Sequence, residues 1–126
     1  MTDTAKPLAL ITGVGPGTGA ALARRFAEGN YRVAMLARNA DRLSALEREI
    51  SNSIAVPCDV SDAAALERAV AQVGDPKVVV HNAVGGAFGT FEQIEAETLR
   101  RNFEINTMAL FHLARLIAPA MVAAGS

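Results

Sequence analysis

Short apolar runs alternate along the chain with longer segments in which apolar residues recur every three or four positions. Runs of the first kind predict buried strands, because each is short and is closed by a glycine, a proline or a polar residue. Segments of the second kind predict helices that bury one face. We therefore expect strands at 8–12 and 31–37, a third strand that begins at 53–56 and runs through Pro57 towards Asp59, and a fourth at 77–81. We expect helices between Gly17 and Gly29, from Asp41 to Ile50, from Ser61 or Asp62 to Val73, and from about Thr98 to Gly125.

This fourfold alternation of strand and helix predicts an α/β fold with a parallel sheet between two layers of helices. Right-handed crossovers favour a Rossmann-like, doubly wound, three-layer αβα arrangement. The 126 residues are expected to form a single domain, 1–126. The predicted sheet stops after its fourth strand and the long helix that follows, so we expect the fourth strand to form a bare edge.

Glycines crowd the junction between the first strand and the first helix, in the stretch TGVGPGTG from Thr12 to Gly19. The P-loop pattern GxxxxGK[ST] fails here, because no lysine followed by Ser or Thr stands at the required place. The dinucleotide pattern GxGxxG/A fits Gly15, Gly17 and Ala20. Its first glycine then lies some way past the strand end, which is a poor fit to that pattern.

A third pattern, Thr-Gly-x-x-x-Gly-x-Gly, starts at the strand end and falls on Thr12, Gly13, Gly17 and Gly19. In this interpretation Gly13 permits a sharp turn, Gly17 lets a pyrophosphate approach the backbone, and Gly19 lets the helix pack on the strand. The free N–H groups and the positive dipole end of the helix then face the phosphates. A glycine-rich turn that binds nothing is the competing interpretation.

The third pattern resembles the coenzyme loop of the short-chain dehydrogenase/reductase family, in its classical type. Three later stretches resemble family elements in the same order along the chain: Cys58-Asp59-Val60 after the third strand, His81-Asn82-Ala83-Val84 after the fourth, and Glu104-Ile105-Asn106 inside the long helix. The resemblance covers essentially the whole chain and corresponds to the N-terminal half of a family member. It implies a nicotinamide coenzyme held by the loop, with Gly15 and Thr18 beside the motif residues.

The resemblance also implies roles for the later stretches. Asp59 with Val60 would contact the adenine ring, and Asn106 would help to organise catalysis. Further coenzyme contacts would come from Asn82, Ala83 and Val84. Plainer interpretations stay open, because Asp and Asn are common turn residues and a helix can carry an Asn on a polar face.

Two positions depart from the family pattern. His81 stands where the family has the first Asn of its Asn-Asn-Ala-Gly element, and Val84 stands where it has Gly. A side chain at Val84 would keep the backbone further from the coenzyme. The Gly85-Gly86 pair that follows would compensate for this.

The end of the second predicted strand indicates which coenzyme is preferred. An enzyme that prefers NAD is expected to carry a carboxylate here for the ribose hydroxyl. The strand instead ends Ala37-Arg38-Asn39, and the first acid is Asp41. Arg38 can hold the 2′-phosphate of NADP through charge-assisted bonds. We therefore predict coenzyme contacts at Arg38 and Asn39 and a preference for NADP(H) over NAD(H), with a solvated surface arginine as the alternative.

The proton-transfer residues that the resemblance implies are not in this chain. The family uses a Ser and a Tyr-x-x-x-Lys pair beyond the long helix, but the only tyrosine is Tyr31, with Met35 four positions later. Asn106 is the only catalytic position present. The resemblance then implies that the chain is the coenzyme-binding half of an NADP-dependent oxidoreductase for a carbonyl or alcohol, shortened in cloning, by proteolysis or in the gene. The alternative is a short, non-catalytic NADP-binding or regulatory module.

Composition and charge limit the kinds of binding partner that we expect. A net charge of −1 lacks the basic excess that favours nucleic acid, and no secretory leader is expected from MTDTAKPLALITG. His112, Arg115 and Pro119 interrupt the most apolar stretch, so we expect no membrane span. The single cysteine, Cys58, fits a cytoplasmic location. We expect a small-molecule substrate and no metal site, and the apolar surplus of the long helix predicts a homo-oligomer.

Overall fold

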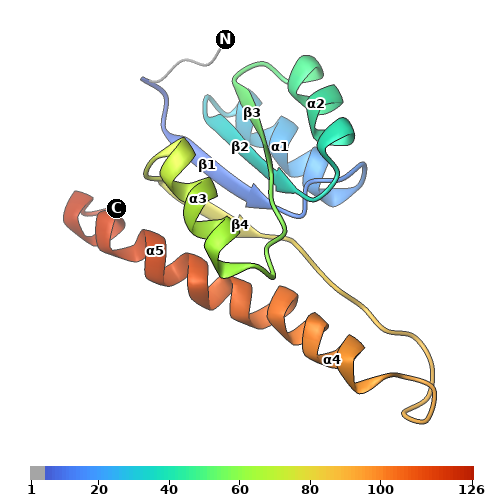
Figure 1. The fold of residues 1–126 in the computed structure, drawn as a ribbon. Helices are drawn as coiled ribbons and strands as arrows, with labels where there is room; N and C mark the ends of the chain where they lie inside the picture. Colours follow the sequence, from blue (N-terminus) through green and yellow to red (C-terminus); the bar gives the residue numbers. More distant parts are fainter. Residues whose placement is uncertain (1–4) are drawn as a thin grey trace.

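The computed structural model describes residues 5–126. Its strands form one parallel sheet in the order β3-β2-β1-β4 (Figure 1). The strands are β1 (Leu8–Thr12), β2 (Arg32–Ala37), β3 (Ser53–Pro57) and β4 (Val78–His81). The helices are α1 (Thr18–Glu28), α2 (Ala40–Glu49), α3 (Ala63–Val73), α4 (Ala96–Phe103), the π-helical turn η1 (Glu104–Met108) and α5 (Ala109–Ala124).

Each face of the sheet packs against its own layer of helices. On one face Ile11 and Met35 meet apolar residues of α1 and α2, such as Leu43. On the other face Leu10 and its neighbours meet α3, η1 and α5, through residues such as Leu113. Because both faces are covered, the strands carry continuous apolar runs. The predicted α/β, doubly wound, three-layer arrangement is confirmed.

Helix starts differ in detail from the sequence-based expectation. Asn39, rather than Asp41, caps α2: its backbone is extended and its Oδ1 accepts the Arg42 N–H at 3.0 Å. Asp41 lies inside the first turn, where a carboxylate is favourable next to the positive end of the helix dipole. Of the two candidates for α3, Asp62 is the cap, because its Oδ1 accepts N–H groups of the first turn. The long helical segment begins at Ala96, slightly before Thr98.

The long helical segment also contains an irregularity that we did not predict. At η1 the Ala109 N–H bonds to the Glu104 carbonyl, five residues back, instead of four. Such single π-helical turns often occur at functional sites. This one contains Asn106.

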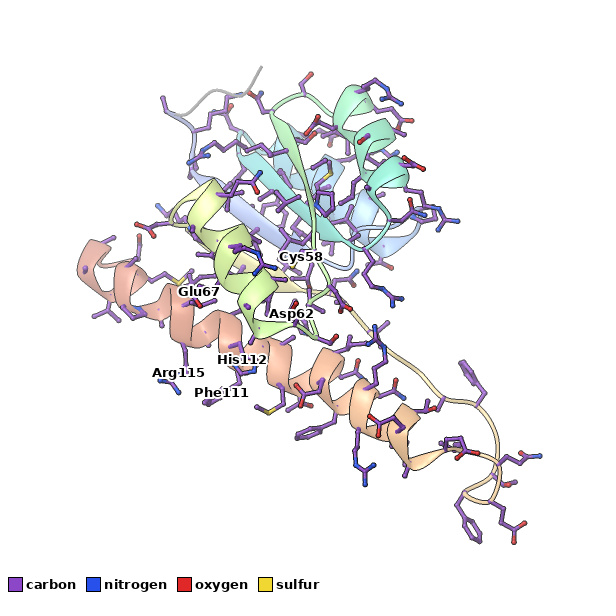
Figure 2. All side chains as sticks on the ribbon, in the orientation of Figure 1. Cys58, Asp62, Glu67, Phe111, His112 and Arg115 are labelled. Carbon is purple, nitrogen blue, oxygen red and sulfur yellow. The ribbon has the colours of Figure 1, made fainter. Side chains whose placement is uncertain are left out.

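Strand β4 pairs only with β1 among the described residues, so it forms the predicted edge of the sheet. The outer surface of α4 and α5 leaves several large apolar side chains about half exposed, including Phe103 and Phe111. Figure 2 shows Phe111 and Arg115 on the side of α5 that is turned away from the sheet. By length and composition the helical segment Ala96–Ala124 could cross a membrane, but core helices pass the same test, so this is weak evidence.

Candidate coenzyme site

The carboxyl ends of the strands align at one edge of the sheet. Thr12 at the end of β1 is level with Leu36 on one side and with His81 on the other. The chain steps outward from β1 to β2 and β3 and then returns to place β4 on the far side of β1. In open α/β sheets ligands bind at such a switch point, outside the carboxyl ends of the strands.

A cleft of about 540 Å³ opens at this edge. Its volume lies within the usual range for small-molecule sites. It is lined by Gly13, Val14, Gly15, Ala37, Arg38, Asn39, Arg42, Cys58, Asp59, Val60, Ala83, Val84 and Ile105. The structure therefore brings residues from all four predicted loops to one place. Five lining residues were not predicted: Val14, Ala37, Arg42, Cys58 and Ile105.

Two glycines of the first loop are required by packing. Gly13 has φ +69°, and a Cβ there would lie 2.6 Å from the N and Cα atoms of Ala83. A Cβ on Gly19 would collide with the carbonyl oxygen of Gly13 and with Val14 Cα. The predicted sharp turn and the close packing of α1 on β1 are both confirmed. The pattern that starts at Thr12 therefore describes the loop better than the one on Gly15, Gly17 and Ala20.

The middle of the same loop is open. A Cβ on Gly15 or on Gly17 would meet nothing within 4 Å. Gly17 precedes α1, and no side chain caps this helix. The first N–H groups of α1, which begins at Thr18, therefore lack a side-chain acceptor among the described residues, and N–H groups of this kind can bind an anion.

Two arginines stand free at the end of β2. Arg38 and Arg42 are exposed, line the cleft, and form no ion pair or side-chain hydrogen bond with the described residues. Arg42 was missed, although its place in the first turn of α2, four residues after Arg38, was available from the sequence. The Asn39 side chain is occupied by capping, which leaves its backbone for other contacts. We call Gly15, Arg38 and Arg42 the open rim.

The end of β3 contributes a carboxylate and a thiol. Asp59 Oδ1 accepts the Ser61 hydroxyl at 2.7 Å and its N–H at 3.0 Å, and Oδ2 pairs with Arg101 at 3.4 Å. These partners, the Ser61 hydroxyl first, lower the pKa of Asp59, which is therefore ionised. Cys58, buried at the end of β3 (Figure 2), has its pKa raised to about 11 by burial and by the adjacent Asp59 and Asp62. Its thiol is protonated near neutral pH.

The ends of β1 and β4 are joined by a hydrogen-bond network centred on the buried Thr12 hydroxyl. Thr12 Oγ1 accepts the N–H groups of Asn82 and Ala83, each at 3.0 Å, and lies 2.9 Å from His81 Nδ1. His81 Nε2 is 2.8 Å from the Ile105 carbonyl oxygen in η1. We call these five residues the strand-end network. The Asn82 amide also donates to the Gly13 carbonyl at 3.1 Å, which ties the loop after β4 to the glycine-rich loop.

Asn106 holds the loop that follows β4. Its Oδ1 accepts the Gly85 N–H at 2.8 Å, and its Nδ2 donates to the Gly85 carbonyl at 3.0 Å. A Cβ on Gly85 would lie 2.6 Å from Asn102 Oδ1 and 3.2 Å from Ile105 Cδ1, so these side chains would have to shift to admit a larger residue. Val84, in contrast, is 78% exposed beside the cleft. Gly85 thus supplies close backbone approach toward the helix, one residue after the departure from the family pattern.

The single tyrosine cannot serve this cleft. Tyr31 precedes β2, whereas Arg38 follows it, so the two residues lie about 20 Å apart at opposite ends of this strand. Tyr31 instead packs edge-on against Phe26, with ring centroids 5.3 Å apart. Within residues 5–126 no group of three or more His, Cys, Asp or Glu side chains is placed to hold a metal ion.

A glycine-rich loop, a topological switch point and a cleft between them define a dinucleotide-binding type of α/β fold. The family model for short chain dehydrogenases matches residues 7–126, and the chain belongs to the short-chain dehydrogenase/reductase family. It is 34% identical to D-erythrulose reductase from Gallus gallus, over 93% of this chain and 48% of the relative. The chain thus spans about half the length of the curated relatives it matches.

Solved structures agree with this assignment. A metagenomic short-chain oxidoreductase in complex with NADP is 33% identical, with a TM-score of 0.87. The alignment covers 94% of this chain and 57% of the metagenomic enzyme. The 3-ketoacyl-(acyl-carrier-protein) reductase from Brucella melitensis, complexed with NADH, is 28% identical and covers 94% of this chain and 52% of its own, with a TM-score of 0.81. Family membership by itself therefore leaves the choice of coenzyme open.

Proposed function

We propose that this chain carries the coenzyme-binding half of an NADP-dependent oxidoreductase that transfers hydride between NADP(H) and a carbonyl or alcohol. The observation that carries the proposal is the open rim. Two guanidinium groups that have no ion-pair partner within residues 5–126 line the cleft at the end of β2, and the stretch Ala37-Arg38-Asn39 contains no carboxylate. A 2′-phosphate would give those charges a bidentate partner.

The rest of the cleft fits the same ligand. The open space at Gly15 and Gly17 and the uncapped start of α1 suit a pyrophosphate. The ionised Asp59, with Val60 beside it, suits the amino edge of an adenine ring. The D-erythrulose reductase relative and the NADP-bound metagenomic enzyme support both the reaction class and the coenzyme.

In this proposal the residues around the cleft bind the coenzyme or orient the loops that contact it. The loop and α1 hold the pyrophosphate, Arg38 and Arg42 hold the 2′-phosphate, and Asn106 sets the position of the loop after β4. When bound, NADP(H) supplies or takes up the hydride at its nicotinamide ring. The Ser and Tyr-x-x-x-Lys pair of the family are absent from these 126 residues.

A coenzyme titration of three variants tests the proposal. Arg38→Ala is expected to weaken NADPH binding by roughly 1.5–3 kcal/mol, about ten- to a hundredfold, and to leave NADH binding nearly unchanged. Arg42→Ala should act in the same direction. Isothermal titration calorimetry of both coenzymes measures these changes.

Arg48→Ala is the matched control, because Arg48 is an exposed arginine of α2, the helix that contains Arg42, but does not line the cleft. It should leave both affinities unchanged. Equal losses for NADPH and NADH in Arg38→Ala would show that Arg38 does not select the 2′-phosphate. If neither coenzyme binds, the proposal as a whole is wrong.

We further expect the 126-residue chain alone to show no carbonyl-dependent oxidation of NADPH, because these residues include no Tyr-x-x-x-Lys pair. Turnover with any carbonyl substrate, followed at the NADPH absorbance band, would contradict this. A stable chain that binds NADP(H) without turnover suits either an enzyme half or the non-catalytic module. We also propose that the protein is a cytoplasmic homo-oligomer that contacts neither nucleic acid nor membrane.

A further inference from the structure

The π-helical turn leaves one carbonyl without its usual helical partner. In an α-helix the carbonyl of residue i accepts the N–H of residue i+4. In η1 the Ala109 N–H bonds instead to Glu104, so the Ile105 carbonyl loses that donor. His81 supplies the replacement from β4, with its Nε2 atom 2.8 Å from the Ile105 oxygen.

The partners of the His81 ring determine where its proton lies. The Ile105 carbonyl can only accept, so Nε2 must carry the proton. Thr12 Oγ1 already accepts two backbone N–H groups, from Asn82 and Ala83, and its own proton therefore points to Nδ1 at 2.9 Å. Only the neutral tautomer with its proton on Nε2 matches every donor to an acceptor.

A second tie joins the same two segments. Four residues after His81, both backbone groups of Gly85 are bonded to the Asn106 side chain, at 2.8 and 3.0 Å. Asn106 is the neighbour of Ile105 within η1. The segment that leaves β4 is therefore attached to η1 at two successive points, and the His81 tie is the more deeply placed of the two.

We propose that His81 is a positioning residue: as a neutral imidazole protonated at Nε2, it holds the π-helical turn against the end of β4 and thereby fixes Asn106 beside the cleft. A consequence for catalysis rests on the proposed function, whereas the hydrogen-bonded arrangement does not. The shorter Asn that the family carries at this position offers polar atoms near the place of Nδ1 only. The link to Ile105 therefore depends on the histidine.

The ring tautomer can be measured directly in the full 126-residue chain without any coenzyme. Two-bond ¹H–¹⁵N correlations distinguish an imidazole protonated at Nε2 from one protonated at Nδ1 and from imidazolium. We expect the His81 ring to show the Nε2–H pattern near neutral pH. His112 provides an internal reference ring from α5. A His81 ring protonated at Nδ1, or at both nitrogens, would overturn the proposal without requiring any variant to fold.

Two substitutions separate the role of Nε2 from that of Nδ1. His81→Gln keeps an amide donor near the place of Nε2, whereas His81→Asn keeps polar atoms only near Nδ1. In His81→Asn we expect the Gly85 amide hydrogen to exchange at least about tenfold faster, and in His81→Gln within about threefold of the parent chain. Equal exchange rates in the two variants would overturn the proposal.

The outcome is independent of the proposed function. A chain that fails to bind NADP(H) but shows the Nε2–H tautomer and the Asn/Gln difference retains the positioning role and refutes only the coenzyme assignment. A chain that binds NADPH but has its His81 ring protonated at Nδ1 supports the coenzyme assignment and refutes only the positioning role. Should His81→Asn not fold, the His81 tautomer in the parent chain still tests the positioning role.

Discussion

The open rim and the strand-end network both lie at the carboxyl ends of the strands, but they differ in whether their polar groups have partners within the protein. In the network each polar atom of Thr12 and His81 is matched to a partner within the protein. At the rim Arg38 and Arg42 have no such partner among the described residues, and Gly15 faces open space. The polar groups of the first region are bonded within the fold, and those of the second are accessible for the coenzyme that we propose.

This difference predicts what a substitution in each of the two regions should change. Removing a group from the strand-end network leaves buried donors or acceptors unpaired, which lowers the free energy of unfolding. Removing a group from the open rim leaves nothing unpaired in the protein and should change only ligand affinity. The following variants test that division, in order of decreasing effect.

Gly13→Ala should cause the largest loss. The added Cβ would lie 2.6 Å from Ala83 backbone atoms at a φ of +69°. Overpacking and a left-handed alanine together are expected to lower the free energy of unfolding by about 3–5 kcal/mol. Urea unfolding followed by circular dichroism measures the change.

Gly15→Ala is the matched control from the open rim, because its Cβ would meet nothing within 4 Å. It should change stability by no more than about 0.5 kcal/mol. Similar losses in both variants would remove the distinction between the packed and the open part of the loop.

Thr12→Val should come next, because it replaces the buried hydroxyl with a methyl group of similar size. The N–H groups of Asn82 and Ala83 and the Nδ1 atom of His81 then lose their partner. We expect a loss of about 2–4 kcal/mol in the free energy of unfolding. Thr12→Ser keeps the hydroxyl and should lose only about 1 kcal/mol for its missing methyl. If Thr12→Ser is the worse variant, methyl packing and not the network stabilises this position.

Asp59→Asn should have the smallest effect and a defined pH dependence. Its Ser61 and Arg101 partners lower the pKa of Asp59, so its stabilisation is present above the unfolded-state pKa and is lost as pH falls through the lower folded-state pKa. Because the side chain is 39% exposed, solvent screening limits the effect to about 1 kcal/mol at most.

The measurement is the difference in unfolding free energy between the parent chain and Asp59→Asn, at about pH 7 and about pH 3. The difference should shrink at the lower pH. Asp75→Asn, an exposed change of equal charge in the loop before β4, is the control for the loss of one negative charge. A difference that grows on acidification would contradict the assigned direction of the Asp59 pKa.

Much of this arrangement was predictable from the sequence. Periodicity identified the strands and helices, because burial on one or both faces fixes the spacing of apolar residues. The spacing of Thr12, Gly13 and Gly19 identified the loop, because only glycine fits its turn and its helix contact. Parallel pairing then required the four loops to meet at one edge, which is where they lie.

The tertiary structure decided what local pattern could not. The π-helical turn has no sequence signal of its own, because the donor that replaces its helical bond comes from His81, on a strand 24 residues away. Whether a polar side chain is bonded within the fold also depends on the folded backbone around it. Asn39 and Arg38 are adjacent in sequence, yet Asn39 caps a helix and the Arg38 side chain has no partner in the part of the chain that the structure describes. The sequence by itself determined the scaffold and its glycines, and tertiary contacts alone separated the open rim from the strand-end network.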